Sequence, residues 1–270
     1  MNIFGIISDE RAYRSKSPAM HNYVFKKTNI EAVYVPFCVQ DLQIENTING
    51  IRALGIVGVN VTVPYKQSVI PYVDIISDEV LAIGAVNTIF NKDNKLYGYN
   101  TDASGLMDVF ERNKIKIKDS IALVFGTGGA SRAVLYALKQ SGAKTIFLAG
   151  RNIEKTRILA DEMSVSALFI YENNIFDIKP DIIINATSVS APEESNKLAE
   201  HFDKMQVVDT VSQVIDINYG RDVNIWKNLA SRMDARFMDG RSMLASQAAR
   251  SFYIWTGKQV DVDMYMKCLL

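Results

Sequence analysis

Histidine and cysteine are scarce in this chain of 270 residues, which contains two of each. Cys38 and Cys268 lie far apart without metal-type spacing, and neither His21 nor His201 has a partner nearby in the sequence. This scarcity nearly excludes a multi-histidine metal site and leaves a Ser-His-Asp triad few ways to assemble. We therefore expect no metal centre, and structural roles for both histidines.

An excess of either charge is also missing, and so are long apolar runs. Thirty Lys and Arg residues balance thirty Asp and Glu residues, so the composition favours neither a nucleic acid nor an anionic membrane as partner. No apolar run approaches the ~20 residues that a membrane-spanning helix needs. Residues 1–7 predict a short strand without a basic start, which is not a signal peptide. We expect a cytoplasmic protein, monomer or homodimer, with a small-molecule partner.

Short β-rich apolar runs alternate with segments of helical period, which is typical of an α/β protein with parallel sheets. The predicted strands of the first hundred residues are 3–7, 32–37, 58–61, 88–90 and 96–99, with helices at 20–27, 42–54 and 78–83. A second series of strands is predicted at 121–125, 145–149, 182–184 and 207–209, followed by a long helix around 243–255. Two α/β domains are expected, with the boundary near 101–120.

A glycine-rich loop follows the predicted strand at 121–125 and precedes a helix. It reads Gly126-Thr127-Gly128-Gly129-Ala130. Glycines let the backbone turn tightly and approach a pyrophosphate, and the helix N-terminus supplies amide donors and a favourable dipole. A plain strand-to-helix turn is the alternative, but the strand before and the helix after favour a dinucleotide site in a Rossmann-type, doubly wound domain.

The end of the next strand indicates which dinucleotide is bound. An NAD site usually has Asp or Glu there, whereas this chain has Gly150-Arg151-Asn152, with Lys155 one helical turn later. A carboxylate would repel a 2′-phosphate, and a guanidinium can bind it through two hydrogen bonds. The position of Arg151 therefore predicts NADP rather than NAD, although an ordinary surface arginine is the alternative.

Polar residues also follow predicted strands in the first half of the chain. Lys66 ends the segment Asn60–Lys66 on a turn fixed by Pro64, Asp102 stands at a predicted helix start, and Asn87 precedes a predicted strand. Strand ends of an α/β sheet are where such side chains converge on a ligand. The alternative is that Lys66 and Asp102 are two surface charges or a modest ion pair.

Together these segments resemble the shikimate dehydrogenase family (shikimate 5-dehydrogenase and quinate/shikimate dehydrogenase) over nearly the whole chain. The family segment Asn-Val-Thr-Val-Pro-Phe/Tyr-Lys is matched by Asn60–Lys66, Gly-Ala-Val-Asn-Thr by Gly84–Thr88, and Asn-Thr-Asp-x-x-Gly by Asn100–Gly105. The glycine loop, the surroundings of Arg151, Asn185-Ala186-Thr187 and the terminal Gly240–Ala248 also match.

The resemblance implies an NADPH-dependent, reversible reduction of 3-dehydroshikimate to shikimate, on the route to chorismate and the aromatic amino acids. It implies Lys66 and Asp102 as the catalytic pair, with substrate bound by Ser15, Ser17, Thr62, Asn87 and Gln247. Its NADP-binding positions are Gly126, Gly128, Gly129, Ala130, Arg151, Asn152, Lys155, Thr187 and Gly240. The substrate domain would comprise 1–105 and 240–270, because the C-terminal helices return to it, and the cofactor domain 106–239.

The chain departs from the family pattern in three places. Arg14 stands where histidine is usual, and Ser188-Val189-Ser190 replaces Pro-x-Gly. The family's late Asp-x-Val-Tyr-x-Pro, aligned at Asp209, gives Ser212 in place of the tyrosine. A serine hydroxyl is too short to replace a tyrosine hydroxyl at a carboxylic acid, so we expect Arg14 to compensate, because a guanidinium pairs with a carboxylate through two bonds. A merely solvated loop is the alternative.

Other functions stay open at this point. A sister enzyme that acts on quinate, or on both quinate and shikimate, would share most of these motifs. A non-catalytic NADP-binding paralogue that senses redox state would explain the departures. A methylene-tetrahydrofolate dehydrogenase has a comparable two-domain plan, but the segments around Ser15–Ser17 and Thr62–Lys66 fit it poorly.

Overall fold

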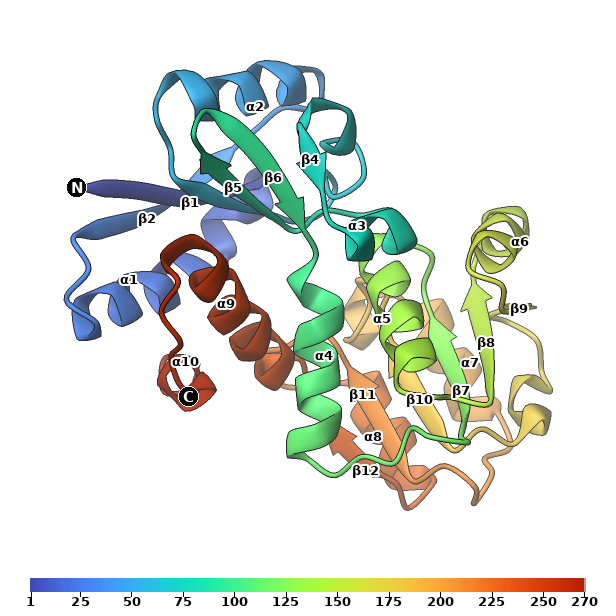
Figure 1. The fold of residues 1–270 in the computed structure, drawn as a ribbon. Helices are drawn as coiled ribbons and strands as arrows, with labels where there is room; N and C mark the ends of the chain where they lie inside the picture. Colours follow the sequence, from blue (N-terminus) through green and yellow to red (C-terminus); the bar gives the residue numbers. More distant parts are fainter. Residues whose placement is uncertain (270) are drawn as a thin grey trace. The chain divides into compact units, whose positions relative to one another are not determined.

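The computed structural model describes residues 1–269 and separates the chain into two units. The terminal unit is formed by Met1–Gly105 together with Leu244–Leu270, and the central unit by Leu106–Met243. The chain passes from one unit to the other inside α4 (Thr101–Arg112) and again inside α9 (Arg241–Thr256). Within residues 1–269, no helix is long and apolar enough to cross a membrane. Each unit is an α/β structure with its own sheet, as predicted (Figure 1).

The sheet of the terminal unit has the strand order β2-β1-β3-β5-β6-β4. Its strands are β1 (Asn2–Ser8), β2 (Ala32–Cys38), β3 (Gly58–Val61), β4 (Ile75–Ile76), β5 (Thr88–Lys92) and β6 (Lys95–Tyr99). The prediction of a parallel sheet is wrong for β5, which is antiparallel to both β3 and β6. Asp93 and Asn94 join β5 to β6 with φ of 51° and 60°, and two such residues make a tight hairpin turn.

Helices cover both faces of this sheet. One face carries a core of Ile, Val and Leu side chains from the strands and from α2 (Ile44–Ala53). The other face packs against α1 (Ser17–Lys27), α9 and α10 (Val262–Met266), whose aromatic residues surround Phe4 and Tyr34. The C-terminal helices therefore return to the first unit, as expected. The remaining elements of this unit are η1 (Glu10–Arg14), η2 (Asp41–Gln43), η3 (Ile70–Tyr72) and α3 (Asp78–Ile83).

The central unit has an all-parallel sheet with the order β12-β11-β10-β7-β8-β9. Its strands are β7 (Ile121–Phe125), β8 (Thr145–Gly150), β9 (Ser166–Phe169), β10 (Ile182–Asn185), β11 (Gln213–Asp216) and β12 (Arg236–Met238). Counted from β7, this is the order 3-2-1-4-5-6 of the dinucleotide-binding fold. The predicted Rossmann-type topology is confirmed.

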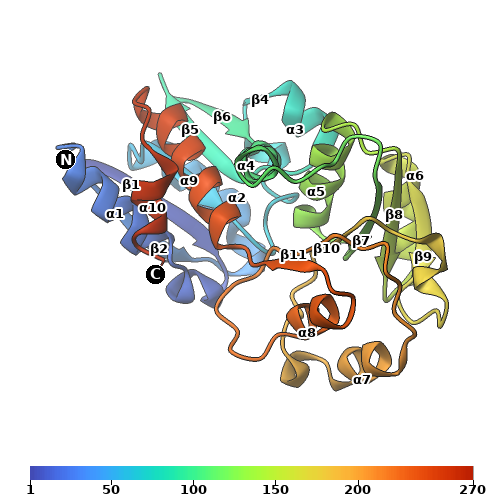
Figure 2. The same cartoon turned by 90° about the horizontal axis from the view of Figure 1, so that it is seen from below.

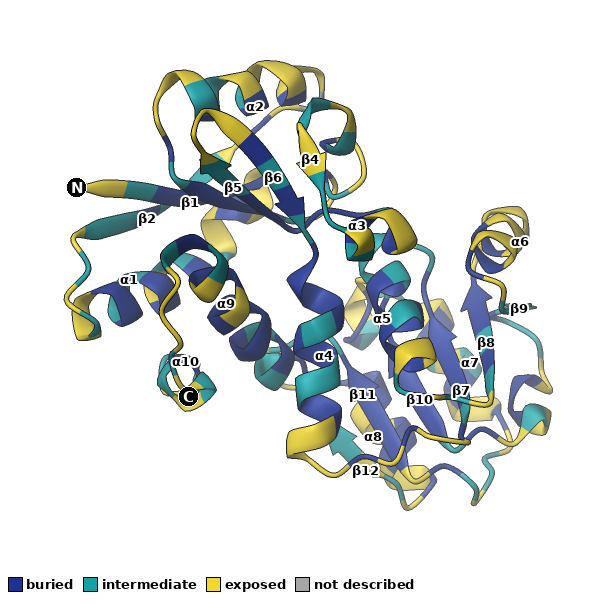
Figure 3. Cartoon of the chain, viewed as in Figure 1, coloured by how far each residue is buried: buried dark blue, intermediate teal, exposed yellow. Residues whose placement is uncertain are grey.

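Helices α7 (Asn196–Lys204) and α8 (Ile225–Arg232) lie on one face of the central sheet, and α5 (Gly129–Gln140) lies on the other (Figure 2). The remaining elements are α6 (Ile153–Glu162), η4 (Ile175–Ile178) and η5 (Pro192–Glu194). The middle strands β7, β10 and β11 are almost entirely buried (Figure 3). Strands covered on both faces explain the continuous apolar runs in the sequence.

The predicted strand at 207–209 is wrong, because these residues form no strand and the chain pairs with β10 only from Gln213 onward. The two runs are alike, since both combine valine with a following aspartate. Strand β11 ends at Asp216, and Tyr219 follows three residues later. Asp216 and Tyr219 have the spacing of the aspartate and tyrosine in the family motif, so Tyr219 rather than Ser212 fits the tyrosine position, and the reason for compensation by Arg14 falls away. Arg14 itself is exposed at the end of η1.

Candidate active site

One edge of the terminal sheet gathers the polar residues of the matched segments. Strand β3 ends just before Thr62, and the antiparallel strand β5 begins opposite Asn60, directly after Asn87. Strand β6 ends at Tyr99, which pairs with Thr88, so α4 begins at this same edge with Thr101. The mixed sheet topology thus places the end of β3, the start of β5 and the start of α4 next to one another.

Lys66 and Asp102 form an ion pair at this edge. The Lys66 Nζ lies 2.6 Å from the Asp102 Oδ2, and the two side chains are only 11% and 9% exposed. Asn100 caps α4, because its Oδ1 accepts from the backbone N–H groups of Asp102 and Ala103. Asp102 lies in the first turn of α4, where the helix dipole favours a carboxylate. Lys66 is thus a cationic donor that has two further N–H groups, and it lies beside the fixed carboxylate of Asp102.

Two amide side chains, Asn87 and Gln247, are bound to Thr101. The Asn87 Nδ2 donates to the Thr101 Oγ1 at 3.0 Å, and the Thr101 hydroxyl lies 3.4 Å from the Gln247 Oε1. The Gln247 Nε2 donates to the Leu244 carbonyl at 2.9 Å. An amide nitrogen carries two hydrogens, and the second one on each has no acceptor among the described residues. Both amides can therefore donate to a ligand.

Hydroxyl groups line the neighbouring strand ends. Ser17 begins α1 and is buried, and its backbone N–H donates to the Ser15 Oγ at 3.1 Å. Thr62 is half-buried directly after β3, and its backbone N–H donates to the Ile7 carbonyl of β1. Ser15 follows η1 and Thr62 follows β3, and hydroxyls such as theirs suit a carboxylate or ring hydroxyls.

In the central unit, the glycine loop lies where the strand order reverses, between β7 and β10. Gly126 has φ of +118°, and a Cβ there would lie 2.7 Å from the backbone of Ala186 after β10. Only glycine fits this combination of backbone angle and close approach. Around Gly128 the space is open, with no atom within 4 Å of an added Cβ. The first N–H groups of α5 have no intrahelical partner, so loop and helix suit a phosphate group.

Thr187 follows β10 on the other side of this switch point. Its backbone N–H and its hydroxyl both donate to the Asn185 Oδ1, at 3.0 and 2.7 Å. The Asn185 Nδ2 donates to the buried Asp216 at 2.8 Å, and Asn224 donates to the same carboxylate. Asp216 thereby fixes the loop that carries Thr187. The sequence analysis missed Asp216 because it placed a strand at 207–209 instead of at Gln213–Asp216.

The predicted 2′-phosphate residues lie at the end of β8. Arg151 is exposed and forms no ion pair with any carboxylate in the described part of the chain. Asn152 caps α6, since its Oδ1 accepts from the Lys155 N–H at 3.0 Å. A guanidinium and an ammonium thus lie near the N-terminus of a helix, where an anion is favoured. Gly240 precedes α9, and a Cβ there would lie 2.0 Å from the Ile217 carbonyl oxygen.

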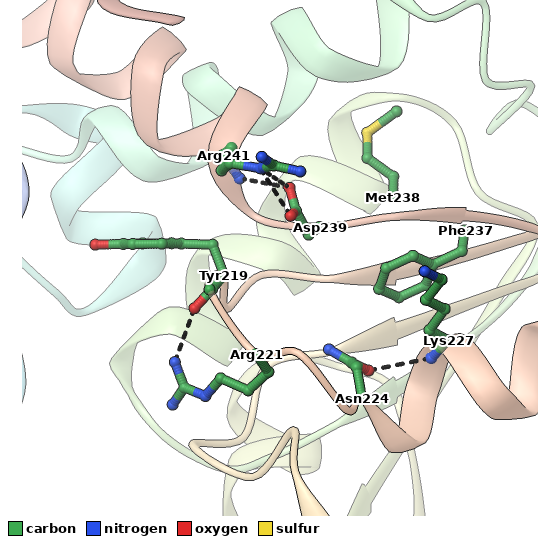
Figure 4. A pocket seen from close by; sticks show the side chains of 9 residues that line it. Tyr219, Arg221, Asn224, Lys227, Phe237, Met238, Asp239 and Arg241 are labelled. Carbon is green, nitrogen blue, oxygen red and sulfur yellow. Dashed lines mark hydrogen bonds and ion pairs between the residues drawn. The ribbon is translucent and has the colours of Figure 1, made fainter. Parts of the chain in front are cut away.

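A pocket opens beyond the ends of β11 and β12, next to Gly240 (Figure 4). Tyr219 and Phe237 supply aromatic walls, and the charged lining includes Arg221, Lys227 and Arg241. Arg221 is paired with Glu194 and Arg241 with Asp239, at 2.7 and 2.8 Å. Tyr219 therefore lines a cavity of the central unit instead of filling its core.

Family models of known proteins match successive parts of the chain. Three family models match the chain in order: the shikimate dehydrogenase substrate binding domain at residues 9–89, shikimate/quinate 5-dehydrogenase at 108–238, and the shikimate 5′-dehydrogenase C-terminal domain at 240–263.

Similar individual proteins cover the whole chain. A shikimate dehydrogenase (NADP(+)) of Caldanaerobacter subterraneus subsp. tengcongensis is 38% identical over 97% of this chain and 94% of its own length. The crystal structure of shikimate dehydrogenase from Aquifex aeolicus, 31% identical, superimposes with a TM-score of 0.89 over 100% of this chain and 97% of that one. Shikimate 5-dehydrogenase from Thermus thermophilus, solved in complex with NADP(H) and shikimate, is 28% identical with a TM-score of 0.87 over 99% and 98%. The family expected from the motifs is confirmed: this chain belongs to the shikimate dehydrogenase family.

Proposed function

We propose that this chain reversibly reduces 3-dehydroshikimate to shikimate with NADPH. The observation that carries the proposal is the Lys66–Asp102 pair with two amide donors close by, all in one unit of the family's fold. The substrate is a ring acid that offers a carboxylate, hydroxyls and one ketone. The terminal unit offers a cation, hydroxyls and amides, which are the groups that such a molecule needs.

The chemistry at the ketone requires stabilisation of a developing negative charge on oxygen. Bound NADPH would supply a hydride for the carbonyl carbon, and the Lys66–Asp102 pair would supply the proton for the oxygen. An ammonium donor aimed at that oxygen stabilises the charge as it forms. Asp102 holds the direction of the Lys66 side chain through the 2.6 Å contact. In the oxidation of shikimate, the same pair accepts the proton from the ring hydroxyl.

The remaining polar groups of the terminal unit would hold the substrate. We assign Ser15 and Ser17 to the carboxylate, and Thr62, Asn87 and Gln247 to the ring hydroxyls. The uncommitted N–H groups of Asn87 and Gln247 support this, because a buried donor without a partner costs free energy until a ligand accepts from it.

The central unit has the features needed for NADP. The open space at Gly128 and the N–H groups of Gly129 and Ala130, which have no intrahelical partner in the first turn of α5, suit a pyrophosphate. Arg151, with Asn152 and Lys155, would bind the 2′-phosphate, while Thr187 and Gly240 would border the nicotinamide end. We therefore assign 106–239 to the cofactor and 1–105 with 240–270 to the substrate, with Gly240 at the boundary; the compact units of the structure divide four residues later, between Met243 and Leu244. Both ligands are small molecules of cytoplasmic metabolism, and we place the enzyme there.

A spectrophotometric assay tests this function. Purified protein is given shikimate or quinate with NADP or NAD, in all four pairings, and formation of reduced cofactor is followed. We expect the highest kcat/KM for shikimate with NADP. A preference for quinate would reassign the substrate, and no turnover in any pairing would overturn the proposal.

A further inference from the structure

Ser251 lies at the centre of a buried cluster of hydroxyl and amide groups behind the candidate active site. Its Oγ lies 2.9 Å from the Thr88 Oγ1 and 3.1 Å from the Thr101 Oγ1, and the Asn60 Nδ2 donates to it at 3.0 Å. Ser251 is fully buried on α9, one turn after Gln247, whose carbonyl accepts from the Ser251 hydroxyl at 3.1 Å. We name Asn60, Thr88, Thr101 and Ser251 the hydroxyl cluster.

Hydrogen bonds connect the hydroxyl cluster to Asn87 and Gln247, the two amides that are assigned to the substrate. Thr88 donates to the Asn87 Oδ1 at 2.9 Å, and Thr101 receives the Asn87 Nδ2 hydrogen at 3.0 Å. The Thr101 hydroxyl also lies 3.4 Å from the Gln247 Oε1. Ser251 contacts both threonines, so it is connected to Asn87 by two routes and to Gln247 by one, in addition to its bond with the Gln247 backbone.

The count of hydrogens shows why a third hydroxyl is needed. The Thr88 hydrogen is used on Asn87, and Thr101 has one hydrogen to share between the Asn87 Oδ1 and the Gln247 Oε1. The Ser251 oxygen accepts a hydrogen of Asn60, and the single Ser251 hydrogen is shared between the Gln247 carbonyl and the two threonine oxygens. Without this oxygen, Thr88, Thr101 and Asn60 each lose a partner in a buried place, and fewer contacts fix the direction of the two threonine hydroxyls.

We propose that Ser251 is a positioning residue, which fixes the direction of the free N–H groups of Asn87 and Gln247 through Thr88 and Thr101. This inference rests on the proposed function, because it gives those two amides to the substrate. Removal of the hydroxyl should weaken substrate binding and leave the chemistry at Lys66 and Asp102 largely in place.

The chain offers a matched control in Ser246. It lies on the same helix and is also buried, but its Oγ has no hydrogen-bond partner in the described chain. Ser246→Ala and Ser251→Ala therefore remove the same group from one helix, and only the second removal affects the cluster. Thermal unfolding of both variants verifies that each is folded at the assay temperature.

The test measures steady-state kinetics for shikimate and NADP in the wild type and both variants. Ser251→Ala should raise the KM for shikimate roughly 2- to 12-fold, the loss expected for one neutral hydrogen bond, with smaller changes in kcat and in the KM for NADP. Ser246→Ala should match the wild type. A Thr101→Val, Ser251→Ala double variant should show less than the product of the single effects, because both changes act on one route.

A second readout needs no activity. The side-chain amide NMR signals of Asn87 and Gln247 should shift in Ser251→Ala and stay in place in Ser246→Ala. If the wild type turns over no shikimate, the proposed function fails, and the NMR result still decides whether Ser251 orients the amides. Unchanged amide signals in Ser251→Ala, or an unchanged KM for shikimate in an active enzyme, would overturn the inference.

Discussion

The guanidinium of Arg151 lies exposed at the end of β8, where a carboxylate would select NAD. Arg151→Ala should raise the KM for NADPH about tenfold or more and leave that for NADH nearly unchanged, because a charge-assisted hydrogen bond contributes ~1.5–3 kcal/mol. Arg157→Ala is the control, since Arg157 is exposed on the next helix and paired with Glu154. Equal losses for both cofactors would remove Arg151 from this role.

His21 predicts how stability depends on pH. Its ring is fully buried, stacked on Tyr34 at 4.5 Å, with Nδ1 3.1 Å from the Tyr265 hydroxyl and no partner for Nε2 within the described chain. Burial lowers the pKa of His21 from 6.5 to about 3. Below pH 6.5, His21 therefore binds a proton in the unfolded chain but not in the folded protein. The contribution of His21 to the free energy of unfolding is fully present above pH 6.5 and is lost as the pH falls toward about 3.

The corresponding experiment compares urea unfolding at pH 7 and pH 5 for the wild type and His21→Phe. The free energy of unfolding of the wild type should fall by about 2 kcal/mol more than that of the variant, at about 1.4 kcal/mol per pH unit. His201 and the carboxylates titrate in both proteins, so their contributions cancel in the comparison. The same pH dependence in both proteins would show that His21 is protonated in the fold.

At the level of elements, Gly105 sets how closely α4 and α9 approach each other. A Cβ at Gly105 would lie 2.9 Å from the backbone N and 3.0 Å from the Cβ of Gln247. Gly105→Ala should therefore push α9 away and lower the free energy of unfolding by about 1–3 kcal/mol, as overpacking does. Gln247, which we assign to the substrate, would move with α9, so the KM for shikimate should rise as well.

Gly50 on α2 is the control for helix propensity. Nothing lies within 4 Å of a Cβ built there, so Gly50→Ala should stabilise the protein by about 0.5–1 kcal/mol through reduced chain entropy. Urea unfolding measures both variants. A stabilised Gly105→Ala would show that the two helices can separate without cost.

The longer elements with a clear apolar period were predicted, whereas the short strands β4, β9 and β12 and the helices α6, α7 and α8 were not. Two further cases needed pairing information. Residues 207–209 and Gln213–Asp216 have nearly the same local pattern, and only the partner strand β10 distinguishes them. The direction of β5 depends on the hairpin at Asp93-Asn94, a signal that was available in the sequence and was not used. The misplaced strand then hid Tyr219 and Asp216.

At the level of the whole molecule, the alternation of strands and helices was enough for the α/β class, and several motifs in order were enough for the family. The hydroxyl cluster could not be predicted from the sequence, because Asn60 and Ser251 are 191 positions apart and a serine on a helix has no distinctive sequence pattern. Short motifs reveal residues that share a loop. Residues that meet only through tertiary packing, such as Ser251 and Thr88, have no such signal.

The central claim is that Lys66 and Asp102 perform the proton transfer of a shikimate dehydrogenase. Its most direct test measures kcat for shikimate oxidation and the Kd for shikimate in the wild type and in Lys66→Met, with Asp102→Asn as an independent check. We expect kcat to fall by ~10²–10⁴-fold, the usual range for a positioned proton-transfer group, while Kd changes far less. A Lys66→Met enzyme with near-normal kcat would contradict the account.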